Sequence, residues 1–157
     1  MKAWRALWKN DLQKLISRPA QDWLLLAEAG FWLGVMRAAI LVIRFQKIAG
    51  WLGLSISPDS PAPSPAQSLA AGQVGWAIRV MAPRTLWESA CLAQSLACAQ
   101  MLNRRRIPGL LFLGVALGLE ANKKFAAHAW MRCGESILVG EGGHQRFQVL
   151  ATFSTQN

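Results

Sequence analysis

Two side chains of the sequence have the types and the setting needed for covalent acyl transfer. Cys91 opens a segment with helical periodicity, and His128 lies in an apolar, strand-like run further along the chain. A cysteine thiolate can attack an acyl carbon, and an imidazole can take the thiol proton and later deliver it to the leaving group. The two residues can be distant in sequence, because a fold can bring a helix end and a strand together. The pair therefore predicts a cysteine-dependent acyl-transfer enzyme.

The position of Cys91 distinguishes it from the other two cysteines. We expect it in the first turn of its helix, where unpaired N–H groups and the helix dipole stabilise a thiolate and an oxyanion. Leu92 would follow it in the wall around the oxyanion. A lone cysteine is otherwise most often a small buried side chain. That role is expected for Cys98, two helical turns further on, and for Cys133, on the strand face opposite His128.

The base and its orienting group are less well defined. His128 is the expected general base and acid, although a hydrogen-bonded core histidine would look similar, and His144 is the only other histidine. Trp130 shares the strand face of His128 and could wall the acyl site. The chain has no aspartate after Asp59, so the carboxylate that would orient the imidazole is expected to be Glu141.

The first third of the chain is expected to be helical, over residues 1–56. Its first helix carries an amphipathic stripe made of Trp4, Leu7, Trp8, Leu12, Leu15 and Ile16. Asp22 could cap a second helix. The apolar span Trp23–Ile43 contains Glu28 and Arg37, and each charge costs about 2.5–3.5 kcal/mol at a bilayer centre. A helix packed on the rest of the protein is therefore favoured over a membrane span, with a membrane-surface helix as the alternative.

The remainder divides into a linker, residues 57–72, and a core, residues 73–157. The linker is rich in Pro, Ser and Ala, and its prolines predict an extended segment without helix. In the core, Ser89 would cap a helix. The pattern then predicts a helix and three strands, at Cys91–Arg105, Leu110–Leu117, Phe125–Cys133 and Ser136–Val139. This order predicts an α+β fold, with the N-terminal helices packed on a small core.

The composition says more about the possible partners and the cellular compartment of the protein than about its reaction. The 157 residues carry 17 Lys plus Arg against 8 Asp plus Glu, a formal net charge of +9. This balance favours an acidic peptide, a nucleic acid or an anionic membrane as a partner, but the charge is spread along the chain and does not choose among them. Three cysteines without metal-ligand spacing, and no signal-like start, predict a metal-free and cofactor-free cytoplasmic protein.

One set of short motifs resembles a known family. The segments that carry the resemblance are Cys91-Leu92, Ser95-Leu96, Ile107-Pro108, Gly114-Val115 and Ala127–Trp130. In this order and spacing they resemble the B-type leader peptidases of lasso-peptide biosynthesis, which belong to the transglutaminase-like, or papain-like, cysteine protease superfamily. Three positions depart from that pattern. Arg106 stands where the family usually has glycine, Met131-Arg132 stands where Val-Glu is more typical, and no aspartate occurs near Gly140-Glu141. For the third catalytic group, the alternatives are that Glu141 substitutes, that the site works as a Cys–His dyad, or that its activity is weakened.

The resemblance implies a fold with a cysteine-bearing helix followed by antiparallel strands that carry the histidine. It also implies an activity: a cysteine protease that removes the leader of a ribosomally made precursor peptide. Its expected partners are a separate leader-recognition protein and a macrolactam synthetase, with no nucleic acid. Transfer of the acyl group to an amine, and a non-catalytic scaffold that contacts other maturation proteins or a membrane surface, remain the alternatives.

Overall fold

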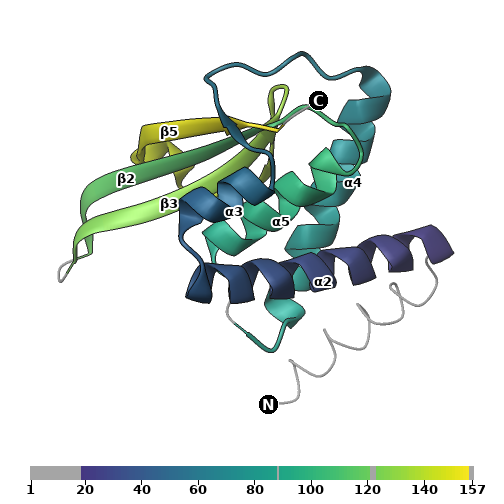
Figure 1. Cartoon of the computed structure of the whole chain (residues 1–157), viewed down its shortest axis with the longest axis horizontal. Helices are drawn as coiled ribbons and strands as arrows, with labels where there is room; N and C mark the ends of the chain where they lie inside the picture. Colours follow the sequence, from purple (N-terminus) through teal and green to yellow (C-terminus); the bar gives the residue numbers. More distant parts are fainter. Residues whose placement is uncertain (1–18, 88, 121–122, 156–157) are drawn as a thin grey trace, which may run out of the picture.

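The fold is an α+β arrangement of helices on one side of an antiparallel sheet (Figure 1). The computed structural model describes residues 19–87, 89–120 and 123–155, so the stripe from Trp4 to Ile16 lies outside the described residues. The elements in chain order are α2 (Ala20–Val42), α3 (Phe45–Trp51), β1 (Ser55–Ile56), α4 (Pro65–Met81), η1 (Ala82–Arg84), α5 (Cys91–Asn103), β2 (Leu110–Glu120), β3 (Lys123–Cys133), β4 (Ser136–Val139), η2 (His144–Arg146) and β5 (Gln148–Ser154). The predicted fold class is confirmed.

The sheet has the strand order β1-β5-β2-β3-β4, and all of its neighbouring pairs are antiparallel. The long β2–β3 hairpin sets its register, with His128 opposite Gly114 and Trp130 opposite Phe112. Strand β5, which the sequence patterns did not predict, pairs with the other edge of β2. Side chains alternate across a sheet, so the functional residues of β3 divide between its two faces.

A single cluster of buried side chains joins the helices to the sheet. Helix α2 contributes residues at helical spacing: Leu26, Ala29, Leu33, Met36 and Ala39. It packs across α4 and α5, while Met131 and Cys133 extend the cluster from β3. The predicted packing of the N-terminal helical segment on the core is therefore confirmed. In the described part of the chain, α2 is also the one helix long and apolar enough to cross a membrane, judged by length and composition alone.

Helix α4 begins inside the segment that was expected to be a linker. The chain is without helix or strand from Ser57 to Ser64, but the helix starts at Pro65, so the linker prediction for residues 57–72 is wrong from there onward. The start is stabilised by a capping box, in which the Ser64 hydroxyl accepts from the Gln67 N–H and the Gln67 side chain accepts from the Ser64 N–H. Proline is compatible with the first helical position, since its missing N–H has no helical partner there.

Two predicted caps are also corrected. The N-cap of α2 is Pro19, and Asp22 lies in the first turn of the helix instead. The N-cap of α5 is Ala90 without a side-chain cap, while Ser89 accepts a hydrogen bond through its carbonyl from the Gln94 side chain at 2.7 Å. Each helix therefore starts within a few residues of the predicted polar cap, but that side chain does not cap it.

The turn after α5 holds Arg106 in a left-handed conformation. Its φ is +52°, a region that favours glycine and costs other residues about 1–2 kcal/mol. The family that the sequence resembles usually has glycine at this position. Arg106 therefore has a backbone conformation that suits glycine, although its side chain differs from the family pattern. Two hydrogen bonds hold the turn: the Ile107 N–H donates to the Leu102 carbonyl at 3.1 Å, and the Gln67 amide donates to the Arg106 carbonyl at 2.9 Å.

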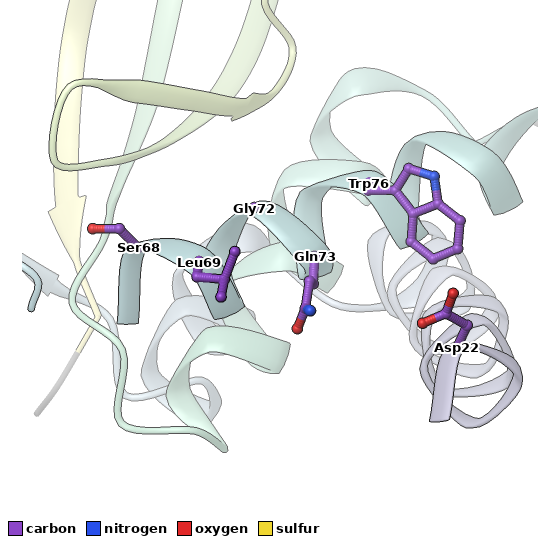
Figure 2. A pocket seen from close by; sticks show the side chains of 6 residues that line it. All are labelled: Asp22, Ser68, Leu69, Gly72, Gln73 and Trp76. Atoms are coloured by element: carbon purple, nitrogen blue, oxygen red, sulfur yellow. The ribbon is translucent and has the colours of Figure 1, made fainter. Parts of the chain in front are cut away.

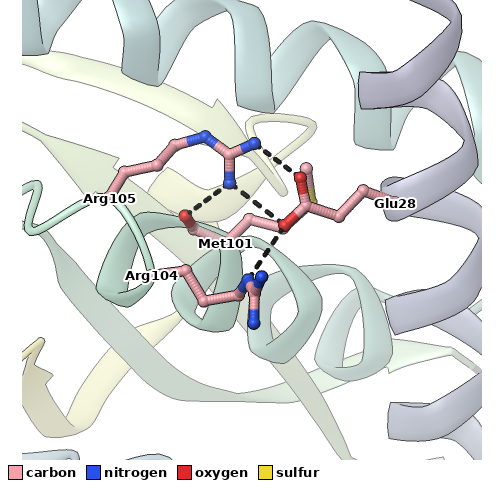
Figure 3. A network of polar contacts seen from close by, with 4 residues as sticks. All are labelled: Glu28, Met101, Arg104 and Arg105. Atoms are coloured by element: carbon pink, nitrogen blue, oxygen red, sulfur yellow. Dashed lines mark hydrogen bonds and ion pairs between the residues drawn. The ribbon is translucent and has the colours of Figure 1, made fainter.

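An ion-pair network ties α2 to the C-terminal end of α5 (Figure 3). Arg105 donates to both carboxylate oxygens of Glu28, at 2.5 and 3.2 Å, and also to the Met101 carbonyl at 2.9 Å. Arg104 adds a second contact to Glu28 at 3.3 Å. The hydrogen bond from Arg105, together with the charges of both arginines, lowers the pKa of Glu28 below its ordinary value of 4.5.

We expect Glu28→Gln to destabilise the protein by about 1 kcal/mol at neutral pH, because a partly buried, charge-assisted pair is lost. Since the pKa of Glu28 is lowered in the folded state, this contribution is present above pH 4.5 and is lost as the pH falls through the lowered value. Urea unfolding from about pH 7 to about pH 2 measures the difference between variant and parent. Glu135→Gln, an exposed change in the β3–β4 turn, serves as control. A difference that does not shrink with acid would contradict the assignment.

Candidate active site

Cys91 is the first residue of α5 and is partly exposed. The first bond of the helix runs from the Gln94 N–H to the Ala90 carbonyl at 3.1 Å, so the N–H groups of residues 91–93 precede the hydrogen-bonded ladder. These groups are the ones that can bind an oxyanion at a helix start. The predicted placement of the cysteine at the beginning of a helix is confirmed.

The loop that leads into Cys91 is held by a compact set of hydroxyl contacts. The Thr85 hydroxyl lies 2.8 Å from the Ser89 hydroxyl and 2.9 Å from the Ala82 carbonyl. The Trp87 ring packs on Gly34 of α2, where an added Cβ would lie 3.1 Å from the ring. These contacts fix the direction in which the chain enters α5, and with it the position of Cys91.

The other two cysteines are buried parts of the core. Loss of solvation raises the pKa of Cys98 to about 12, and it also raises the pKa of Cys133 above its ordinary value. A thiol with a raised pKa carries less thiolate at neutral pH, so both are poor nucleophiles. Their expected structural role agrees with these positions.

His128 lies on β3, and its imidazole is held through one nitrogen. Nε2 is 2.7 Å from the Gly140 carbonyl oxygen. A carbonyl only accepts, so Nε2 must carry the proton in this contact, and Nδ1 of the neutral ring keeps the lone pair that a general base needs. The ring also contacts the rings of Trp130 and Phe147, with centroids at 5.9 and 4.9 Å. The tautomer and the ring plane are therefore both fixed.

Gly140 is the residue that sequence reasoning missed. Its φ of +78° and its closeness to β3 exclude a side chain, because an added Cβ would lie 2.4 Å from the Ala129 carbonyl and 2.7 Å from Trp130 Cβ. This close approach brings its carbonyl to His128. The sequence feature that could have indicated it is the family's aspartate position near Gly140-Glu141. That position suggests the Glu141 carboxylate as the partner of the imidazole, and not the Gly140 carbonyl.

Glu141 does not make the contact expected of a third catalytic group. It is exposed, and its carbonyl, not its carboxylate, accepts from His144 Nδ1 at 2.7 Å. Among the described residues, the Glu141 carboxylate makes no hydrogen bond to His128. The orienting role of Glu141 therefore stays a prediction. In the structure, the imidazole is held by the Gly140 carbonyl and not by a carboxylate.

Trp130 and Leu92, the two expected wall residues, lie in different surroundings. Trp130 is 5% exposed and stacks on Phe112 at 5.3 Å with an interplanar angle of 5°, and His144 lies on it at 5.7 Å. It thus forms an aromatic wall beside His128. The Leu92 side chain packs against the helical core, which leaves its backbone N–H as the group that can face an oxyanion.

The structure brings the elements of Cys91 and His128 into contact but does not join the two side chains. Helix α5 packs on β3, and Met131 and Cys133 from that strand enter the core beneath the helices. By strand alternation, His128 and Trp130 project from the other face. Within the described part of the chain, the Cys91 thiol has no hydrogen bond to His128. Proton transfer between the two groups therefore requires a rearrangement that brings the imidazole to the thiol.

The described residues form no metal-binding cluster. Among residues 19–87, 89–120 and 123–155, no three His, Cys, Asp or Glu side chains gather as they would around a metal ion. A cavity of about 420 Å³ lies between the start of α2 and α4, with Asp22 and Trp76 on facing helices (Figure 2). Its lining residues are Asp22, Ser68, Leu69, Gly72, Gln73 and Trp76, and they include neither Cys91 nor His128.

Comparison with known protein families shows to which family the chain is related. The model of the family described as transglutaminase-like superfamily matches residues 32–152, which include α5, β3 and Gly140. The chain belongs to the transglutaminase-like superfamily. This transglutaminase-like domain indicates a cysteine-type catalytic enzyme of the protease and acyltransferase class. No curated protein and no solved structure matches the chain significantly.

We expect Glu141→Gln to keep at least about half of the parent activity, because the imidazole is held by a backbone carbonyl that the substitution leaves in place. Gly140→Ala should lose activity by about a hundredfold or more, since the added Cβ must displace that carbonyl. Turnover of both variants, with circular dichroism as a check of folding, measures the two effects. A large loss in Glu141→Gln would restore the carboxylate to the orienting role.

Proposed function

We propose that this transglutaminase-like protein is the leader peptidase of a lasso-peptide system, acting on a ribosomally made precursor together with a leader-recognition protein. The motifs from Cys91 to Trp130 support this specificity, and the superfamily supports the cysteine-dependent chemistry. The observation that carries the proposal is a cysteine at the start of α5 together with an imidazole, on the strand that α5 contacts, whose Nε2 is fixed by the Gly140 carbonyl.

The proposed reaction requires the Cys91 thiol and the His128 imidazole to come together. In the complex with substrate, Nδ1 of His128 takes the Cys91 proton, and the thiolate attacks the carbonyl at the leader–core junction. The backbone N–H groups of Cys91 and Leu92 stabilise the oxyanion. Protonated His128 then donates to the amine of the core peptide, which leaves. Water attacks the thioester, His128 takes its proton, and the leader departs as a carboxylate.

The charge of the protein suits a peptide substrate with acidic residues. Its formal net charge of +9 attracts an anionic chain and raises its rate of encounter. The freed core amine would then be used by a macrolactam synthetase, which makes that enzyme a further expected partner. A cytoplasmic location, where thiols stay reduced, fits the three free cysteines and belongs to the same proposal.

Mass spectrometry of the precursor, incubated with this protein and the leader-recognition protein, tests the proposal. A single cut that yields a leader carboxylate and a free core amine is the expected result. Adding a primary amine separates the transamidase alternative, because a transamidase would give a leader amide that is heavier than the leader carboxylate by the mass of the amine less that of one water. An intact precursor in the presence of the recognition protein would contradict the peptidase assignment.

A non-catalytic scaffold is the second candidate, and two observations favour it. The Cys91 thiol is not hydrogen-bonded to His128 among the described residues, and the carboxylate usual in such sites is missing. Iodoacetamide labelling at neutral pH discriminates the two functions. An activated Cys91 should react about tenfold or more faster than a free thiol of ordinary pKa, whereas a scaffold cysteine should not.

A further inference from the structure

A second cavity lies beside the sheet, beneath the proline-rich segment that leads into α4. Its volume is about 340 Å³, at the small end of the range of ligand pockets, about 300–1,000 Å³. It is lined by the segment Ser60–Pro63, the start of β2 and the β3–β4 turn. Pro61, Pro63 and Leu110 give it apolar walls. Its polar contributors are Ser60, Arg132 and Glu135.

Two polar side chains of this cavity each have a buried atom without a hydrogen-bond partner. Arg132 Nε and Ser60 Oγ are both buried without a hydrogen bond. The Arg132 guanidinium lies over the Phe112 ring at 5.1 Å, and among the described residues it forms no ion pair. A buried donor left unpaired costs about 1–3 kcal/mol, and more when it is charged. A cation and a hydroxyl that converge on one cavity would both be satisfied by a single anionic group.

We propose that this cavity binds a carboxylate of a peptide chain, with Arg132 as its charged partner and Ser60 as a second donor. An arginine fork matches a carboxylate in geometry. One cation facing the acidic Glu135 suits a single negative charge better than a doubly charged phosphate. The apolar walls suit the hydrocarbon part of a peptide residue. The carboxylate can come from an acidic side chain or from a chain end, which the experiment distinguishes.

The position of Arg132 connects this cavity to the candidate active site. It lies four residues beyond His128 on β3 and on the same face, which corresponds to about 13 Å along the strand. A peptide running along this face could place a carboxylate in the cavity while its scissile bond lies near His128. This inference rests on the proposed function only in naming the precursor peptide as the natural ligand.

Nuclear magnetic resonance of the Arg132 Nε–H group tests the proposal in ¹⁵N-labelled Cys91→Ala protein, which cannot cleave the peptide. The signal is identified by its loss in Arg132→Lys. The probes are an acetylated, amidated tetrapeptide Gly-Leu-Glu-Gly, its Gln counterpart, the Gln counterpart with a free C-terminus, and inorganic phosphate. We expect a saturable shift with a carboxylate peptide and none with the amidated Gln peptide. The responding peptide identifies the source of the carboxylate.

Further variants test the same cavity if Arg132→Lys folds poorly. Ser60→Ala should weaken binding about threefold, whereas Glu135→Gln should strengthen it about twofold by removing a like charge at the rim. Lys47→Gln on α3 removes one positive charge from a residue that does not line the cavity, and it should leave binding unchanged. The absence of a shift with every carboxylate peptide, or equal binding of phosphate, would overturn the proposal. Because cleavage is absent in this protein, either result is independent of the leader peptidase assignment.

Discussion

Replacing Cys91 by Ala should abolish cleavage of the precursor, with a loss of about 10⁴-fold or more, because no other described thiol can act as the nucleophile. The substitution removes one sulfur atom at a partly exposed helix start and leaves the core unchanged. The protein should therefore keep its thermal unfolding temperature within about 2 °C. Product mass spectrometry and circular dichroism measure the two quantities on the same sample.

Cys98→Ala is the matched control for this prediction. Cys98 lies on the same helix, and burial raises its pKa to about 12, so it should contribute nothing to the chemistry. We expect this control to lose some stability through a small cavity, about 1 kcal/mol, while its turnover stays within about twofold of the parent. Residual cleavage in Cys91→Ala, or its loss in Cys98→Ala at temperatures where the variant is folded, would show that the nucleophile is wrongly assigned.

Replacing His128 by Gln should lower turnover by about 10³-fold while the protein remains folded. The glutamine amide can still donate to the Gly140 carbonyl, so the local hydrogen bond has a substitute, but an amide cannot act as a base near neutral pH. We also expect the rate of iodoacetamide labelling at Cys91 to fall toward that of an ordinary thiol, since the imidazole no longer takes the proton. Single-turnover kinetics and labelling rates give the two measurements.

His144→Gln is the control that decides between the two histidines. His144 contacts the same Trp130 ring as His128, but its Nδ1 is used in a local turn with the Glu141 carbonyl. Its substitution should change turnover by less than about threefold. If His144→Gln abolishes turnover and His128→Gln does not, the base is on η2, and the role assigned to the Gly140 carbonyl is wrong.

The family pattern and the structure together explain two departures in this chain. Arg106 keeps the left-handed backbone that glycine would adopt more easily, with hydrogen bonds on both sides of the turn. The missing aspartate falls where the Gly140 carbonyl reaches His128, so a backbone acceptor stands in the place of a carboxylate. A carbonyl fixes the tautomer as a carboxylate does, but it carries no full charge to stabilise the imidazolium. We therefore expect a slower enzyme than one with the complete triad.

The elements of the site could be predicted from local patterns, because these depend on neighbouring residues. Helical spacing after Cys91 and the apolar run around His128 placed both residues in the correct kinds of element. The same patterns predicted the hairpin partners of β3 and the burial of Cys98 and Cys133. Strand β5 was missed, since it has few buried residues and is stabilised by pairing with β2, which lies more than thirty residues earlier in the chain.

The sequence by itself determined the α+β class and indicated a candidate nucleophile and base, since side-chain chemistry and hydrophobic periodicity are properties of short segments. Only the tertiary structure decided what holds the imidazole. The contact depends on the positive φ of Gly140 and on the approach of its backbone to β3, and neither leaves a pattern in side-chain types. It also decided that Arg132 and Ser60, seventy-two residues apart in the chain, face one cavity. Long-range packing brings such groups together, and no local spacing encodes it.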